Sequence, residues 1–209
     1  MMNRTRLACV IGIPLVAAVT IWAIAQRNNQ RLAGPATYPL TADHLQEWGA
    51  YDELLAELER FGEATLAQRL TVVREQGLIW VAPFMEESQQ ALYVSSLGLV
   101  ERIYIAKDAL LVQDLPFPGD GIPEAWRSTY ARLRLGGTLF HELLHLDGEL
   151  DEGEVYHQEA TWYASLSKSA FFGSLEGAAE REYRWAIDSA IASAHRAAEI
   201  ATSGNPETE

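Results

Sequence analysis

Two histidines and a glutamate stand together at residues 141–145, where the sequence reads His-Glu-Leu-Leu-His. Residues four apart lie one above the other on the same face of a helix, so His141 and His145 can bind one metal ion. Glu142 follows the first histidine directly and lies close enough to act on a water molecule at such an ion. The pattern predicts a metal-dependent reaction. Two histidines that serve only packing or solvation are the alternative interpretation.

The composition restricts what can complete such a site. The chain has 209 residues and a single cysteine, Cys9, which excludes an intramolecular disulfide and a metal site built from several thiolates. The remaining ligands must therefore be histidines or carboxylates. With 29 acidic and 16 basic residues, the net charge is -13 and repels nucleic-acid phosphates, so nucleic acid is excluded as an expected partner.

Over residues 136–159 the sequence resembles the HExxH zinc metallopeptidases, the zincins. The resemblance implies Zn²⁺ as cofactor, His141 and His145 as ligands, and a peptide or protein as substrate. It also implies that Glu142 is the general base for hydrolysis by a zinc-bound water. The extended pattern with a third histidine at short fixed spacing is absent, so the nearer match is the gluzincin branch, where a carboxylate completes the site. The alternative function is a degenerate zincin domain that serves as a non-catalytic, membrane-anchored binding module.

Geometry ranks the residues that could be the third ligand. If the chain reverses around residues 147–150 into an antiparallel helix pair, Glu154 lies opposite His145 and is the first choice. Glu159 and His157 are the alternatives. Glu159 lies about 140° around the helix from Glu154, so at most one of these two carboxylates faces the ion. Three side chains are within helical reach of the site as donors to a developing oxyanion: Tyr156, His157 and Tyr163.

The elements that position these residues follow from hydrophobic periodicity and from the Gly and Pro residues. Before the motif, the pattern predicts a helix capped by Thr41, a helix over residues 63–75, and strands over 78–82, 91–94 and 100–106. The active-site helix is expected to begin at Pro123, and two further helices cover residues 151–166 and 175–202.

The predicted fold class is α+β and zincin-like: N-terminal helices, a small antiparallel or mixed sheet, the HExxH helix and C-terminal helices. Gly136 and Gly137 lower the helix propensity of the active-site helix, which indicates close packing against a neighbour at this point. The resemblance also implies that substrate lies along a sheet edge beside this helix, and the strand over residues 100–106 is the choice for that edge.

The chain divides into four segments. Residues 1–25 contain the uncharged run Leu7–Ala25, which is flanked by arginines and long enough to cross a bilayer. This run predicts an N-terminal transmembrane anchor or, alternatively, a cleaved signal sequence. Residues 26–40 form a polar linker, 41–203 the metallopeptidase domain and 204–209 a polar tail. The expected location is the membrane, with a single-pass anchor and an extracytoplasmic domain, or the periplasm or exterior after cleavage.

Overall fold

The structure is a computed structural model, and it describes residues 36–83, 90–96, 100–112 and 127–203. Within these ranges the chain is a mixture of helices and one small sheet, which confirms the predicted α+β class. The elements are β1 (Tyr38–Pro39), α2 (Leu45–Arg60), α3 (Ala64–Glu75), β2 (Ile79–Ala82), β3 (Ala91–Ser96), β4 (Val100–Ala106), α4 (Lys107–Leu111), α5 (Arg127–Leu146), α6 (Glu152–Leu166), α7 (Ala170–Gly173) and α8 (Gly177–Thr202).

The sheet has four strands in the order β1-β2-β4-β3. Strands β2 and β4 pair in parallel, with Val81 opposite Ile105, whereas the other two pairings are antiparallel. Strand β4 is therefore paired on both sides and has no free edge. The expectation that residues 100–106 form the edge beside the active-site helix is wrong, and β3 is the strand in that position.

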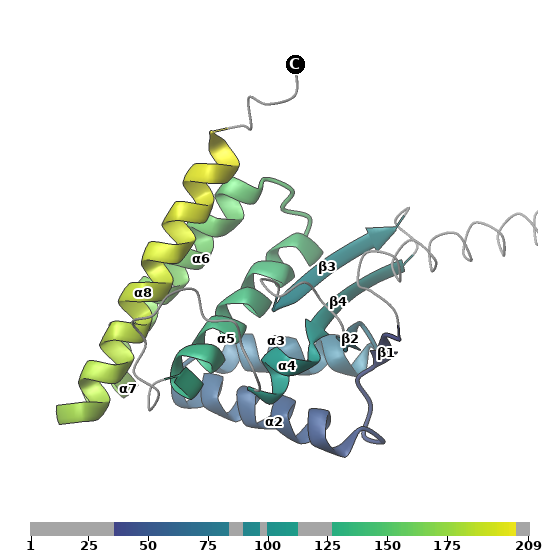
Figure 1. The fold of residues 1–209 in the computed structure, drawn as a ribbon, viewed down its shortest axis with the longest axis horizontal. Helices are drawn as coiled ribbons and strands as arrows, with labels where there is room; N and C mark the ends of the chain where they lie inside the picture. The colour runs from purple at the N-terminus through teal and green to yellow at the C-terminus, as the bar shows by residue number, and fades with distance from the viewer. Residues whose placement is uncertain (1–35, 84–89, 97–99, 113–126, 204–209) are drawn as a thin grey trace, which may run out of the picture.

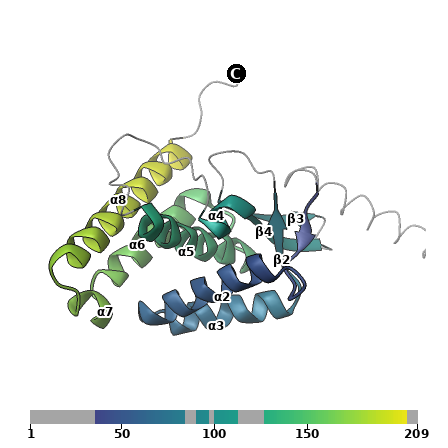
Figure 2. The ribbon, with the colours of Figure 1, turned by 60° about the horizontal axis from the view of Figure 1, so that its bottom comes forward.

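Helix α5 runs through the middle of the molecule, with α6 and α8 side by side on one flank and β3 on the other (Figure 1). Helices α2 and α3 lie across the lower part of the molecule, where they pack under α5 (Figure 2). Consequently α5 is in contact with elements from both halves of the chain, and its last turn lies between the sheet and α6.

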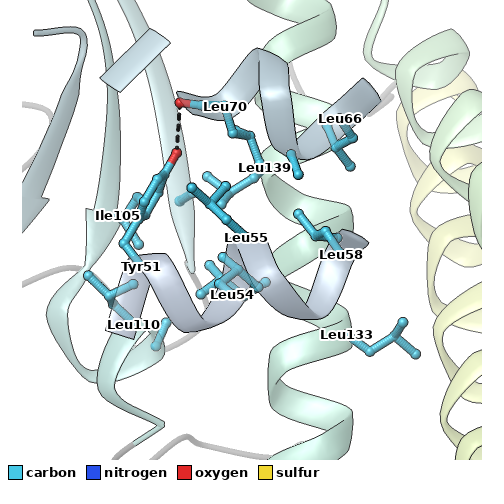
Figure 3. Packing of buried hydrophobic residues seen from close by; sticks show 14 of the residues in the cluster. Tyr51, Leu54, Leu55, Leu58, Leu66, Leu70, Ile105, Leu110, Leu133 and Leu139 are labelled. Carbon is cyan, nitrogen blue, oxygen red and sulfur yellow. Dashed lines mark hydrogen bonds between the residues drawn. The ribbon is translucent and has the colours of Figure 1, made fainter. Parts of the chain in front are cut away.

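The main core lies where α2, α3 and α5 meet one face of the sheet (Figure 3). Its side chains include Leu54 and Leu58 of α2, Leu139 of α5 and Ile105 of β4. The hydroxyl of Tyr51, which has no exposed surface, donates a hydrogen bond of 3.2 Å to the backbone carbonyl of Leu70 in α3. The bond satisfies a polar group that would be costly to bury alone, and it ties α2 to α3.

The two glycines of α5 are in close contact with neighbouring elements, as the sequence predicted. A Cβ atom on Gly136 would lie 3.2 Å from Leu58 Cδ2, and one on Gly137 would overlap the hydroxyl of Tyr163. A third glycine, Gly153 in α6, faces the end of α8, where an added Cβ would lie 2.5 Å from Thr202 Cγ2. Helices α5, α6 and α8 therefore approach one another closely because glycine is present at these contacts.

Helix α5 ends and α6 begins within a few residues. Gly148 has a φ of +97°, and the amide of Glu149 donates to the carbonyl of Leu144 at 3.0 Å, which together form a glycine-based C-terminal cap. Asp151 then caps α6, because its side chain accepts a hydrogen bond of 3.0 Å from the amide of Glu154. This short turn sets the position of every α6 side chain relative to the two histidines.

Some sequence predictions are corrected or lie outside the described residues. The linker predicted over residues 26–40 includes β1, where Tyr38 pairs with Val81, and the first helix begins at Leu45 rather than directly after Thr41. The predicted start of α5 at Pro123 and the polar tail over residues 204–209 lie outside the described ranges.

The single-pass membrane anchor is also corrected. No helix in the described part of the chain is both long and apolar enough to span a bilayer. The run Leu7–Ala25, on which that expectation depended, lies outside the described residues. The anchor is therefore not retained in the functional proposal below.

Candidate metal centre

The two histidines of the motif lie in the last two turns of α5 and point at the same position. Their Nε2 atoms are 3.1 Å apart, and their ring centroids are 4.9 Å apart. His141 is buried and His145 is partly buried, so the rings meet at the edge of the core. The predicted one-turn spacing of the histidines therefore places two imidazole nitrogens within reach of one ion.

The contacts of the two Nδ1 atoms determine which nitrogen of each ring faces the point where the rings meet. His145 Nδ1 lies 2.7 Å from the backbone carbonyl of Glu149, and His141 Nδ1 lies 3.3 Å from Glu159 Oε2. Because a carbonyl and a carboxylate oxygen accept hydrogen bonds, these partners assign the proton to Nδ1 in both rings. With both rings neutral, the two Nε2 lone pairs converge, and their repulsion is relieved by a metal cation between them or by a proton on one Nε2.

Glu152, the first residue of α6, supplies a third donor. Its Oε2 lies 3.4 Å from His141 Nε2, and its Oε1 lies 3.3 Å from His145 Nε2. Two atoms bound about 2.0–2.1 Å from one zinc at tetrahedral angles lie about 3.3–3.4 Å apart. The separation of the two rings and the distance from each ring to its nearer Glu152 oxygen are close to this value. Among the described residues, no other group of three His, Cys, Asp or Glu side chains could hold a metal ion.

Glu154, the first choice from the sequence, lies outside this group. Its side chain is exposed and accepts a hydrogen bond of 3.1 Å from Gln158. Two residues along a helix correspond to a rotation of about 200°, so Glu154 faces away from α5 when Glu152 faces toward it. The prediction that Glu154 lies opposite His145 was wrong by two residues. Asp151 caps α6, so the helix begins at Glu152, and this residue faces the histidines.

The two alternative ligands also take other positions. Glu159 is only 3% exposed and contacts Nδ1 of His141, on the side of the ring opposite the converging Nε2 atoms. His157 is exposed, and its ring lies 6.1 Å from that of His195 on α8, away from the histidine pair. The structure therefore places Glu159 behind a ligand and His157 outside the site.

Glu142 is buried beside the centre and is tied to the sheet. Its Oε2 accepts a hydrogen bond of 2.6 Å from the backbone amide of Tyr93 in β3. Burial raises the pKa of the Glu142 carboxyl, and the nearby His141 and the Tyr93 amide act in the opposite direction. A bound cation would also lower this pKa, because it favours the carboxylate.

The Tyr93 amide belongs to the free edge of the sheet. In the antiparallel β3–β4 pair, Gln90 lies opposite Ala106 and accepts its amide hydrogen bond at 2.9 Å. Backbone groups alternate in direction along such a strand, so those of Ala91, Tyr93 and Ser95 point away from β4. Glu142 of α5 therefore lies at the outer edge of β3, where it occupies the Tyr93 amide.

Two tyrosine rings border the centre. Tyr156 lies 4.6 Å from the His141 ring, and Tyr93 is stacked 6.3 Å from the His145 ring with an angle of 13° between the planes. Burial and the neighbouring Glu152 raise the pKa of Tyr156, so its hydroxyl is a donor at neutral pH. Of the three predicted oxyanion donors, Tyr156 is at the site, whereas His157 is remote and Tyr163 is buried under Gly137.

Sequence reasoning missed Glu152 and Tyr93. The signal for Glu152 was available, because Asp151 is a strong capping residue and a cap at this position places the next residue at the helix start. Tyr93 could not be found from the sequence, since its role depends on the strand order rather than on its side chain.

No known protein family, curated protein or solved structure matches this chain.

Proposed function

We propose that this protein is a zinc-dependent metallopeptidase, with His141, His145 and Glu152 as ligands and Glu142 as general base. The observation that supports it most directly is the convergence of three side chains: the two Nε2 atoms are 3.1 Å apart, and each lies 3.3–3.4 Å from one of the two carboxylate oxygens of Glu152. The second support is that the motif glutamate is intact, buried and next to these donors.

The chemistry of the donors favours zinc. Two neutral imidazoles and one carboxylate are a donor set found in catalytic zinc sites, and they leave one tetrahedral position open. The absence of further cysteine in the chain removes thiolate alternatives. Glu152 is exposed, with 55% of its side-chain surface accessible, so the open position is expected on the solvent side of the pair.

The residues of this chain divide the catalytic work. When bound, zinc supplies a Lewis acid that polarises a peptide carbonyl and makes water acidic near neutral pH. Glu142 takes the proton of the attacking water and returns it to the leaving amine. Tyr156, whose ring lies against His141, is the proposed donor of a hydrogen bond to the oxygen that becomes negative.

The open edge of β3 supports a peptide substrate. An extended peptide can add to a free strand edge through backbone hydrogen bonds, with little dependence on its sequence. Ala91 is buried and the Tyr93 amide is taken by Glu142, so the part of this edge at the exposed Ser95 is the one left for a peptide. A peptide bound there brings its carbonyl groups close to both Glu142 and the donor set.

The decisive experiment compares the full-length chain with Glu142→Gln. The variant keeps the shape of the side chain but cannot accept a proton, so it should bind zinc normally and lose hydrolysis of a broad peptide library. Glu154→Gln, on the exposed face of α6, is the matched control and should keep both properties. Wild-type protein that binds zinc but cleaves nothing, like the variant, would contradict the enzyme proposal and favour the binding-module alternative.

A further inference from the structure

Glu159, whose carboxylate contacts Nδ1 of His141, is buried, and no basic side chain of α6 is seen to pair with its negative charge. Glu159 is 3% exposed; its carboxylate lies 3.3 Å from His141 Nδ1, and the Tyr163 hydroxyl is a second polar neighbour. Removing a carboxylate from water is unfavourable unless hydrogen bonds or an opposite charge compensate for it. A source of positive charge is therefore expected nearby.

Arg134 provides that charge from α5. It precedes His141 by seven residues, which is close to two full helical turns, so both side chains lie on the same face. Burial alone would lower the pKa of the Arg134 guanidinium, but Tyr163 and Glu159 raise it overall. Arg134, Tyr163 and Glu159 are therefore electrostatic neighbours inside the α5–α6 contact.

Gly137 creates the space between Arg134 and His141. It lies three residues after Arg134 and four before His141, and a Cβ atom there would overlap the Tyr163 hydroxyl. The Tyr163 hydroxyl therefore lies against the turn of α5 between Arg134 and His141. Tyr163 Oη and Arg134 Nη1 are buried and make no hydrogen bond of regular geometry within the described residues, so what links these two side chains to Glu159 is electrostatic. Such atoms are uncommon in folded proteins and call for a specific explanation.

We propose that Arg134, Tyr163 and Glu159 form a buried polar network that positions His141 for metal binding, with Arg134 compensating the charge of Glu159. Glu159 then holds Nδ1 of His141, which directs Nε2 toward His145 and Glu152. Arg134 and Glu159 are positioning residues, because neither contacts the converging donor atoms. This inference rests on the proposed metal centre. It adds that Arg134, two helical turns before His141, influences the zinc affinity of that centre.

The network is distinguished from simple packing by a double-mutant cycle. Arg134→Gln and Glu159→Gln keep polar side chains of similar size but remove one charge each. Glu159→Gln is expected to weaken Zn²⁺ binding about 10–100-fold, the usual range for partners of metal ligands, and Arg134→Gln, which acts through Glu159, by no more than that. Because both changes remove the same interaction, the double variant should lose no more zinc affinity than the single variant with the larger loss. Zn²⁺ affinity is measured on the full-length chain by competition with a chelator.

Two further variants test the charge and the hydroxyl separately. Arg134→Lys restores a cation and should recover most of the zinc affinity that Arg134→Gln loses. Tyr163→Phe removes only the hydroxyl, and a measurable loss of affinity is expected without loss of helical circular dichroism. Substitution with Co²⁺ gives a spectroscopic readout, since a rotated His141 ring changes the visible absorption spectrum whereas a remote packing defect does not.

Arg132→Gln is the matched control, because Arg132 is also on α5 but pairs with Glu53 of α2 at 2.8 Å. It should leave zinc affinity and the Co²⁺ spectrum unchanged. Additive losses in the cycle, or wild-type affinity in Arg134→Gln and Tyr163→Phe, would overturn the network while leaving the metal centre intact. A wild-type chain that binds no zinc would overturn the network and the proposed function together. Zinc binding without hydrolysis would contradict the proposed function alone.

Discussion

Glu142 Oε2 and the backbone nitrogen of Tyr93 are 2.6 Å apart, which joins the motif helix to the free edge of the sheet. The bond holds the carboxylate on the side of α5 where an extended chain could pair with β3. The glutamate of the motif and the outer strand of the sheet are thus brought together by one contact between elements that are far apart in the sequence.

The identity of the third ligand can be tested on two neighbouring glutamates. Glu152→Ala removes a donor atom, so zinc affinity should fall by more than the 10–100-fold that is typical of residues behind the ligands. Glu154→Ala should leave the affinity within a few-fold of wild type, because its side chain faces solvent. Chelator competition measures both, and a larger loss in Glu154→Ala would show that α6 is rotated relative to this structure.

The cap of α6 should control both stability and metal binding. Asp151→Ala removes the side chain that accepts the Glu154 amide, which is expected to cost about 1 kcal/mol of folding free energy. Because the cap fixes the first turn, where Glu152 lies, zinc affinity should fall as well. Ser169→Ala removes the corresponding cap of α7, where Phe172 donates at 3.4 Å, and should leave zinc affinity unchanged. Urea unfolding and metal titration separate the two effects, and equal zinc affinities in both variants would contradict this role of the cap.

The close approach of α5 and α6 predicts opposite effects of two glycine substitutions. Gly137→Ala places a methyl group on the Tyr163 hydroxyl, and overpacking of this kind costs roughly 1–3 kcal/mol or more. Gly49→Ala in α2 meets nothing within 4 Å and should stabilise the protein by up to about 1 kcal/mol through helix propensity. Thermal unfolding of the two variants provides the comparison. Tolerance of alanine at residue 137 would mean that Tyr163 is not held in this position.

The stability of the protein should depend on pH through Glu47. A hydrogen bond from Lys107 lowers the pKa of the Glu47 carboxyl below its ordinary value of 4.5, although burial acts in the opposite direction. A lowered pKa in the folded state contributes stability that is present above pH 4.5 and is lost as the pH falls through the folded value. Glu47→Gln should therefore weaken the decline in stability below about pH 4.5, when unfolding is followed in urea at several pH values.

Lys107→Met serves as the control for that pH effect, because it removes the partner at 2.8 Å and leaves Glu47 in place. The lost hydrogen bond should bring the folded-state pKa of Glu47 back toward its ordinary value, so the decline in stability below about pH 4.5 should shrink. If both variants keep the wild-type pH profile, the acid sensitivity originates at another carboxylate.

The local parts of the site could be predicted from the sequence because they depend on one helix. His141, Glu142 and His145 occupy adjacent turns of α5, so helical periodicity alone places the two rings together. The strands and helices around the motif were also predictable, since their apolar residues repeat with the period of each element. Gly136 and Gly137 correctly indicated a close helix contact.

The remaining parts depend on geometry between elements. Whether Glu152 or Glu154 faces the histidines is decided by the φ of +97° at Gly148 and by the Asp151 cap, which together determine where α6 starts. The edge strand is β3 and not β4, because β4 pairs in parallel with β2. The alternation of apolar residues predicts where a strand lies in the sequence, but it does not predict which strands pair.

The contact between Gly153 and Thr202 sets an order of events during biosynthesis. The first turn of α6, which carries Glu152, lies against the last turn of α8. Chains fold from the N-terminus as they are synthesised, so the histidine pair leaves the ribosome well before the helix that packs behind Glu152. Under the proposed function, firm binding of zinc by all three residues is consequently a late step in the maturation of each molecule, and a chain that ends within α8 would keep both histidines but would have a poorly supported Glu152.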